Sequence, residues 1–452
     1  MPHLPQELVD MIVVLLAEPI ELDIRPYKNP IAQYATINRA WAVAVERYTF
    51  RSIHLQPSDC NIKKVEPNPF LGPIQVKPAD SGMTVARLAQ ALQREGGYRR
   101  YYMKFLAFKL DYENHPINHL VHDSSPAQSR ATTDAVFSRD IADLWAILAH
   151  WPRPSKLRLE LSLDGPKSYN HGMIKTTDFL NYVGGPLPLL SNVKSLMLGT
   201  NACIQPQSVT QLLTSLPALE EVFLDFDELC NSYWYTEEYS VISIDTDTAL
   251  LGCIAQIPYS CESVDLYVGY APYNQLGPND AFLCAGMAPL SLRLIRLNLT
   301  GSAASVTLLD IMAALPWPRL KYLDANYTVT GDDCEPNFRF VNDLQVAAGR
   351  AARATPSLVA MNISYTEFGD PLFKSADWID VGLDIRFSCK KDERLVEWDC
   401  GELGGKYPLL EYAVLKAWGV DKHPEDIEWY GSYGRWTAQE VVDWKVPSKQ
   451  LR

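Results

Sequence analysis

The feature that most constrains the fold is a six-residue pattern that returns along the chain from residue 157 onward. It reads L-x-x-h-x-h, where h is apolar and x is mostly polar, and a helix-like amphipathic segment precedes most copies. Alternating apolar positions predict a short strand with one buried face, and apolar spacings of three and four predict a helix. The copies start at Leu157, Val193, Leu219, Cys261, Leu292, Leu320 and Leu358.

A single helix–strand unit of this kind cannot bury its own apolar face, so neighbouring units must stack. The starts lie between 26 residues apart (193 to 219) and 42 residues apart (219 to 261), so insertions must project from the loops. We therefore predict an α/β fold with an irregular leucine-rich-repeat solenoid over residues 151–419 and parallel strands on its concave face. An ordinary α/β domain with parallel strands is the alternative.

Residues 1–51 form a predicted helical unit of their own. Apolar residues at helical spacing occupy 4–16 and 37–48, and Pro19, Pro26 and Pro30 mark a loop between them. A unit of about 50 residues buries little surface alone, so it needs a partner or a neighbouring domain.

The rest of the chain is divided less sharply. Residues 52–150, with five prolines between 57 and 78, are predicted to be a connector and the first degenerate repeats, with helices at 85–92 and 134–150 and a strand-like stretch at 101–110. Leu395–Cys400 and Leu410–Leu415 resemble degenerate last repeats. Thr437 and Glu440 form a capping box that predicts a helix over 438–444. Residues 420–452 are therefore interpreted as a C-terminal cap.

Composition argues against several classes of protein. The chain has 41 Lys and Arg against 54 Asp and Glu, a net charge of −13, which repels nucleic acid. Its longest apolar run, Met11–Ala17, is far shorter than the roughly 20 residues that span a bilayer, and the run lacks the basic flank of a signal peptide. Nine cysteines without a C-x-x-C pair indicate a reducing compartment, the cytoplasm or nucleus.

Catalytic and cofactor motifs are scarce in the sequence. His115, His119 and His122 have a spacing that would allow zinc binding if the loop closed, but thiolate ligands are absent. There is no phosphate-binding G-x-x-x-x-G-K-[ST] and no dinucleotide-binding G-x-G-x-x-G. We therefore predict a protein that is not an enzyme and that has no metal site and no cofactor; an enzyme using the histidine loop is the least favoured alternative.

Two motifs in the helical unit carry a resemblance to a known family. Leu4-Pro5-Gln6-Glu7-Leu8 opens the first helix, and Arg39-Ala40-Trp41 stands in the second. In this order they resemble an F-box, and the whole chain resembles the fungal F-box-like proteins that carry irregular leucine-rich repeats. The loop at 18–30 is longer than the family's usual turn.

The resemblance implies a substrate-recognition subunit of an SCF-type ubiquitin ligase. Such a protein binds the SCF adaptor subunit, and through it a cullin, while its repeats capture a protein substrate. The alternative is that the apolar residues pack internally and the chain is a leucine-rich-repeat scaffold or sensor with no ligase role. The residues that the resemblance assigns to the adaptor interface, as contacts or as support for it, are Leu4, Pro5, Leu8, Ile12, Leu15, Leu16, Ile37, Trp41 and Val45.

Candidate substrate-binding residues are the polar positions of the predicted strands and the aromatic residues near them. Acids outnumber arginines among these positions, which favours a neutral or basic protein segment as the partner, and Tyr and Trp are frequent at interface hot spots. The aromatic residues have an alternative role in sealing the edge of the core. The predicted set is Phe223, Asp225, Tyr233, Trp234, Tyr235, Asp265, Tyr267, Arg296, Asn298, Asp324, Asn326, Tyr327, Asn362 and Tyr365.

Overall fold

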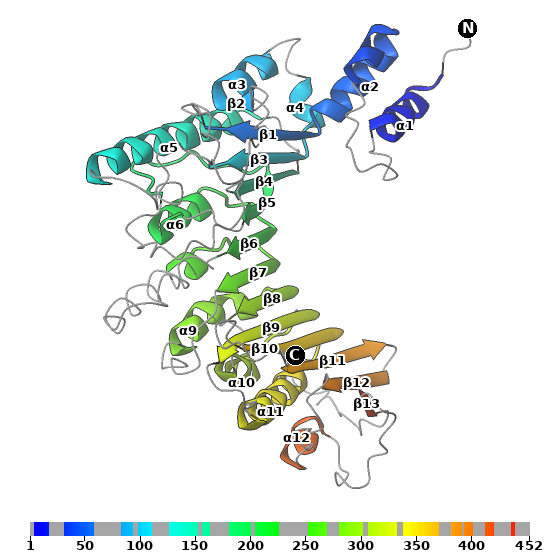
Figure 1. Ribbon diagram of the computed structural model, residues 1–452, viewed down its shortest axis with the longest axis vertical. Helices are drawn as coiled ribbons and strands as arrows, with labels where there is room; N and C mark the ends of the chain where they lie inside the picture. Colours follow the sequence, from blue (N-terminus) through cyan, green and yellow to red (C-terminus); the bar gives the residue numbers. More distant parts are fainter. Residues whose placement is uncertain are drawn as a thin grey trace, which may run out of the picture. The chain divides into compact units, whose positions relative to one another are not determined.

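The structure is a computed structural model that describes most of the predicted helices and strands. The described residues are 4–17, 31–57, 83–93, 98–110, 126–151, 156–162, 180–199, 204–225, 252–268, 280–301, 306–331, 338–369, 381–390, 393–400, 412–419 and 435–438. The chain divides into an N-terminal unit (1–168 and 180–202) and a C-terminal unit (169–179 and 203–452). In both units helices lie against one face of a sheet (Figure 1).

The N-terminal unit begins with three helical segments and continues into a parallel sheet. The segments are α1 (Gln6–Ala17), the 3-10 helix η1 (Ile31–Thr36) and α2 (Arg39–Thr49). The strands are β1 (Ser52–Gln56), β2 (Met83–Thr84), β3 (Phe105–Lys109), β4 (Leu157–Ser162) and β5 (Val193–Leu198). Their order is β2-β1-β3-β4-β5, and neighbouring strands run parallel. The remaining helices are α3 (Val85–Gln93), α4 (Arg99–Tyr102) and α5 (Pro126–Ala149).

The C-terminal unit alternates helices with five parallel strands. The strands are β6 (Glu221–Asp225), β7 (Ser263–Val268), β8 (Arg296–Gly301), β9 (Tyr322–Gly331) and β10 (Ala360–Gly369), in that order. The helices are α6 (Pro206–Thr214), α9 (Asp280–Ser291), α10 (Val306–Ala314) and α11 (Phe338–Ala354), with a helical turn at 252–255. The predicted alternation of helix and parallel strand is confirmed here.

The end of the C-terminal unit differs from the prediction. Strands β11 (Val381–Lys390), β12 (Glu393–Cys400) and β13 (Arg435–Ala438) follow β10 as antiparallel neighbours, so Leu395–Cys400 is not a further parallel repeat. Leu410–Leu415 is not a strand either, because α12 covers Tyr412–Ala417. Ala438 ends a strand where the capping box predicted the start of a helix. Pairing with β12 overrides that local signal, and 439–452 lie outside the described residues.

A repeated backbone contact joins successive parallel strands. One carbonyl oxygen just before a strand accepts hydrogen bonds from two consecutive N–H groups at the start of the next parallel strand, over 2.8–3.2 Å. This contact fixes the register of these strand pairs and gives a hydrogen-bond acceptor to backbone N–H groups at the start of the strand. The accepting residues are Arg51, Glu220, Glu262, Ile295 and Lys321.

This contact also corrects the reading of the repeats. The acceptor always follows the first apolar residue of the pattern, so the copy predicted at Leu292 in fact starts at Leu294, while Leu292 is exposed. Two earlier copies, Phe50–Leu55 and Met103–Phe108, escaped the sequence analysis. Their apolar positions are buried like those of the later copies.

Alternation along each strand separates the core from the opposite face. Leu297 and Leu299 on β8 are fully buried, whereas Arg296 is exposed and Asn298 is half-buried.

In the N-terminal unit, α5 has a row of fully buried side chains that includes Phe137, Ile141 and Trp145. No described helix is both long enough and apolar enough to cross a membrane.

We expect Leu299→Ala to lower the free energy of unfolding by about 2–5 kcal/mol, because it leaves a cavity in the core. The adjacent Thr300→Ala, on the opposite face, should change it by about 0.5 kcal/mol or less. Urea unfolding midpoints measure both. Equal losses at the two positions would contradict this assignment of the faces.

Candidate protein-binding surfaces

The helices α1 and α2 share a small core. Val9, Val13, Ala44 and Val45 are buried together, and the partly buried side chains around them are Tyr34, Ala35, Ala40, Trp41 and Tyr48. Asn38 caps α2 by accepting the Trp41 N–H over 3.2 Å, and the Tyr34 and Trp41 rings lie 5.9 Å apart. The core therefore uses only one side of α1.

The other side of α1 carries a row of exposed apolar side chains. At about 100° per residue, Leu8, Met11 and Leu15 fall within roughly 60° of arc, and Val9 and Val13 point about 150° away from them. Large exposed apolar residues gathered in one place mark interaction sites more often than single ones do. Leu4 directly precedes the helix and Ile37 follows η1, and all five residues are between 45% and 66% exposed. We call these five residues the apolar row.

The structure divides the predicted adaptor residues between two environments. Leu4, Pro5, Leu8, Leu15 and Ile37 are exposed, and Ile12 and Leu16 are half-buried.

The other two predicted residues belong to the supporting core. Val45 is buried in the α1–α2 core, and the partly buried Trp41 packs against it. Met11, which the sequence analysis did not select, is one of the most exposed members of the apolar row. Its spacing of three from Leu8 and four from Leu15 was the available signal.

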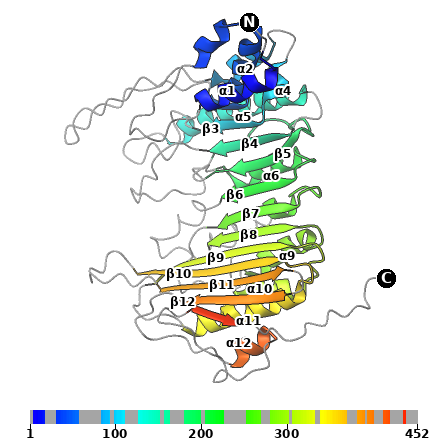
Figure 2. The same ribbon diagram turned by 90° about the vertical axis from the view of Figure 1, so that its right-hand side faces the viewer.

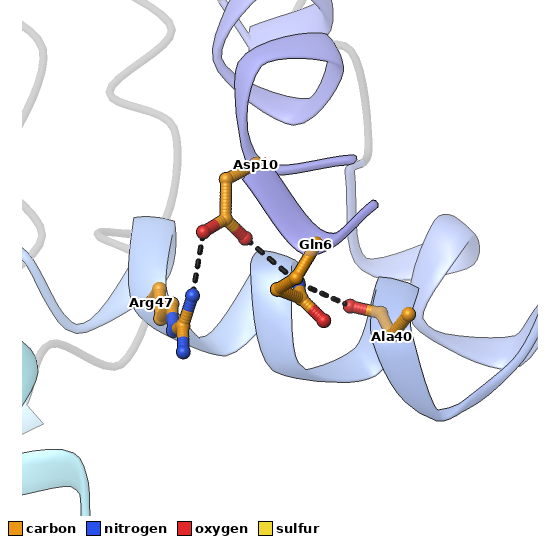
Figure 3. A network of polar contacts seen from close by, with 4 residues as sticks. All are labelled: Gln6, Asp10, Ala40 and Arg47. Carbon is orange, nitrogen blue, oxygen red and sulfur yellow. Dashed lines mark hydrogen bonds and ion pairs between the residues drawn. The ribbon is translucent and has the colours of Figure 1, made fainter. Parts of the chain in front are cut away.

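Polar contacts fix the orientation of α1 on α2 (Figure 3). The Gln6 side-chain amide donates to Asp10 Oδ1 over 2.8 Å and to the Ala40 carbonyl over 3.0 Å. Arg47 Nη1 donates to Asp10 Oδ2 over 2.6 Å, and this hydrogen bond raises the pKa of Arg47 above its ordinary value. The ion pair is partly exposed, so its contribution to stability is about 1 kcal/mol or less.

A second set of contacts attaches α2 to the helices α3 and α4 of the N-terminal unit. Arg99 donates to Glu46 over 2.6 Å and to the Ala91 carbonyl over 3.0 Å, and its guanidinium lies 4.7 Å from the centre of the Phe50 ring. Phe50 ends α2 and also starts the first repeat, so α2 runs directly into β1. The apolar row is therefore carried by helices anchored to the first strands.

Substitution by aspartate should distinguish the two sides of α1. Val13→Asp buries a carboxylate in the α1–α2 core, which is unfavourable, so we expect hydrogen exchange across residues 6–17 to rise by at least tenfold. Leu15→Asp, two residues away on the exposed side, should leave this exchange within about twofold of wild type. The reverse order would show that the exposed side is the one that packs.

The second candidate surface is the face of the C-terminal sheet that its helices leave uncovered. In Figures 1 and 2 the helices α9, α10 and α11 lie on the opposite face. Strand register aligns the side chains of this surface, which we call the open face, into three rows. From β6 to β10 the rows are Glu221, Ser263, Arg296, Tyr322 and Ala360; Phe223, Asp265, Asn298, Asp324 and Asn362; and Asp225, Tyr267, Thr300, Asn326 and Ser364.

Two carboxylates flank an amide in the middle row. Asn298 Nδ2 donates to Asp265 Oδ2 over 3.0 Å. Partial burial raises the pKa of Asp265, and the Asp324 charge raises it further, although the Asn298 hydrogen bond opposes both. Burial also raises the pKa of Asp324, against the attraction of Arg296, whose guanidinium lies 5.2 Å from the Tyr322 ring centre. The two charges are thus held in an unfavourable setting.

The predicted substrate residues are mostly brought together on the open face. Nine of them lie in its rows: Phe223, Asp225, Asp265, Tyr267, Arg296, Asn298, Asp324, Asn326 and Asn362. Tyr233, Trp234 and Tyr235 lie outside the described residues.

Tyr327 and Tyr365 are corrections to the predicted set. Both are buried, and their rings stack 5.9 Å apart with an interplanar angle of 10°. Tyr327 has the same strand parity as the buried Leu323 and Ala325, so it points to the core. These two tyrosines therefore seal the core instead of meeting a partner.

The described residues offer little for covalent or metal chemistry. Burial raises the pKa of Cys253 to about 11 and that of Cys261 to about 12, so neither thiol forms the reactive thiolate near neutral pH. Within the described ranges no three His, Cys, Asp or Glu side chains gather as a metal site. His115, His119 and His122 lie outside those ranges.

The raised pKa values predict how stability depends on pH. A carboxylate with a raised folded-state pKa destabilises the fold above that pKa, and the effect disappears as the pH falls towards the unfolded value of about 4. The double variant Asp265→Asn with Asp324→Asn should therefore be at least as stable as wild type at pH 7, and any advantage should shrink towards pH 4. Urea midpoints at the two pH values test this. An advantage that grows on acidification would contradict it.

No protein-family model matches this chain, and no curated protein matches it.

Proposed function

We propose that this protein is a substrate-recognition subunit of an SCF-type ubiquitin ligase. The observation that carries the proposal is the apolar row, displayed by a small helical pair that is anchored to an array of helix–strand repeats. The first motif, Leu4 to Leu8, starts this row, and the second motif at Arg39–Trp41 begins α2. The SCF adaptor subunit is the proposed partner, and a cullin joins through it.

The helices α1 and α2 support an adaptor-binding role because their shared core uses only some of the apolar side chains of α1. One side of α1 is used against α2, and the opposite side carries Leu4, Leu8, Met11 and Leu15. Exposing several large apolar side chains is unfavourable at about 25 cal/mol per Å², and a partner that covers them removes this penalty. The proposed adaptor contacts are the apolar row with Pro5, Ile12 and Leu16, while Trp41 and Val45 support the helix pair from within.

The repeats provide the second half of the proposal. We infer that the parallel strands with their covering helices form a leucine-rich-repeat solenoid whose uncovered strand face captures a protein substrate. The protein then acts without chemistry of its own and without a cofactor. It raises the effective concentration of substrate lysines near the charged conjugating enzyme, which places it in the cytoplasm or nucleus.

Binding to a purified SCF adaptor subunit tests the proposal. Wild type should bind, and the double variant Leu8→Asp with Leu15→Asp should weaken binding by at least thirtyfold, as expected for the loss of interface hot spots of about 2 kcal/mol. Isothermal titration calorimetry with full-length protein measures both.

The matched control is Leu189→Asp, which places the same charge at an exposed leucine elsewhere in the N-terminal unit. It should bind the adaptor within about twofold of wild type. The proposal fails if wild-type protein does not bind, or if the control loses as much affinity as the double variant.

A second candidate function is a repeat scaffold or sensor in which the helical pair is only an N-terminal cap. The packing of Trp41 and Val45 inside the pair, and the attachment of α2 through Arg99 and Glu46, favour it. An N-terminal cap needs no partner at the apolar row. The cap is therefore favoured if wild-type protein does not bind the adaptor and if Leu8→Asp with Leu15→Asp leaves the stability unchanged.

A further inference from the structure

The open face has a consistent chemical character. Its described rows carry four acids against one arginine, and its other residues are neutral. The charged residues are Glu221, Asp225, Asp265 and Asp324 against Arg296. The face is acidic over the strands β6 to β10, on a chain with a net charge of −13.

We infer that the open face binds an extended protein segment rich in arginine or lysine. This deepens the proposed function by naming the substrate class, and it rests on that function. Charge complementarity selects this occupant over an acidic or phosphorylated segment, which the same carboxylates would repel.

The middle row shows where a cation would sit. Asp265 and Asp324 lie on strands β7 and β9, one on each side of Asn298, and are separated by two strand spacings, or about 10 Å. A cationic side chain above Asn298 is attracted by both carboxylates and relieves their mutual repulsion. Arg296 fills this role only in part, because it attracts Asp324 from the neighbouring row, where its guanidinium lies over the Tyr322 ring.

The rows also suit the shape of an extended segment. Five parallel strands from β6 to β10 extend a row over roughly 19 Å, which is about six residues of extended chain. Phe223 stands at one end of the middle row, half-buried, where its ring can receive a guanidinium or the apolar stem of a lysine. A single small cation would use only the Asp265–Asp324 part of this surface.

The probe for this inference is a fluorescein-labelled 12-residue peptide of alternating arginine and serine, measured by anisotropy with full-length protein at 0.15 M salt. We expect saturable binding that weakens at least tenfold in the Asp265→Asn, Asp324→Asn double variant. The matched control removes two exposed carboxylates from helices, Asp143→Asn with Asp343→Asn, and should change affinity by less than twofold. The corresponding glutamate–serine peptide should not bind.

Several results would overturn the inference. They are no binding of the arginine–serine peptide to wild type, equal weakening in both double variants, and displacement of the peptide by spermine at equal charge concentration, which would indicate a site for free polycations. Far-UV circular dichroism and urea midpoints establish that each variant is folded.

Adaptor binding separates this inference from the proposed function. The open-face variant should bind the adaptor like wild type, since the substitutions are far along the sequence from α1. If the adaptor binds but the peptide does not, only the inferred substrate class fails. If the peptide binds but the adaptor does not, the proposed ligase role fails and the chain binds basic segments for another purpose.

Discussion

The sheet of the C-terminal unit depends on a backbone carbonyl before a strand that accepts two N–H groups from the next strand, a contact made by Glu220, Glu262, Ile295 and Lys321. This contact sets the register between neighbours, and register decides which residues share a row. Because side chains alternate along a strand, a fixed register sends the apolar set of every repeat to the helices at once, as Leu297 and Leu323 show in adjacent strands. It equally sends Asp265, Asn298 and Asp324 to the opposite face. A binding surface thus arises from the same contact that builds the core, without any residue devoted to shaping it.

The parallel strands were predictable because their pattern requires only local information. Leu219, Val222 and Leu224 alternate as a buried strand must, and they are buried. The segment around Leu292 was misread since S-L-R-L-I-R-L-N-L offers two frames of alternating leucine, and only the position of the Ile295 carbonyl distinguishes them. The copy at Phe50 begins directly after the apolar spacing that predicts a helix over 37–48, and the copy at Met103 lies within the stretch at 101–110 that was predicted only as strand-like. The strand at Arg435–Ala438 depends on pairing with β12, which no local signal reveals.

The candidate sites show the same division between local and long-range information. Tyr327 follows Leu323 and Ala325 at a spacing of two, so its burial was readable from the sequence, and its aromatic character misdirected the assignment. The faces of α1 were not readable in this way. Leu8, Val9, Ile12, Val13, Leu15 and Leu16 spread over roughly 160° of the helix, and the period alone does not show which part of that arc meets α2. Contacts with α2 determine which side of α1 is buried. Gln6 and Asp10 fix the orientation of α1 through Ala40 and Arg47.

The two candidate surfaces differ in the force that would hold a partner, and this has a consequence for regulation. Burial of the apolar row depends on the hydrophobic effect, which moderate salt changes little. Attraction to the open face depends on charge, which is screened over about 8 Å at physiological ionic strength. An interaction of the second kind is also abolished when a modification, such as lysine acetylation or phosphorylation of a neighbouring serine, neutralises the basic segment. If both surfaces work as proposed, the protein would stay attached to its adaptor under conditions in which its client is exchanged. The durable contact and the switchable contact would then be assigned to different residues of one chain.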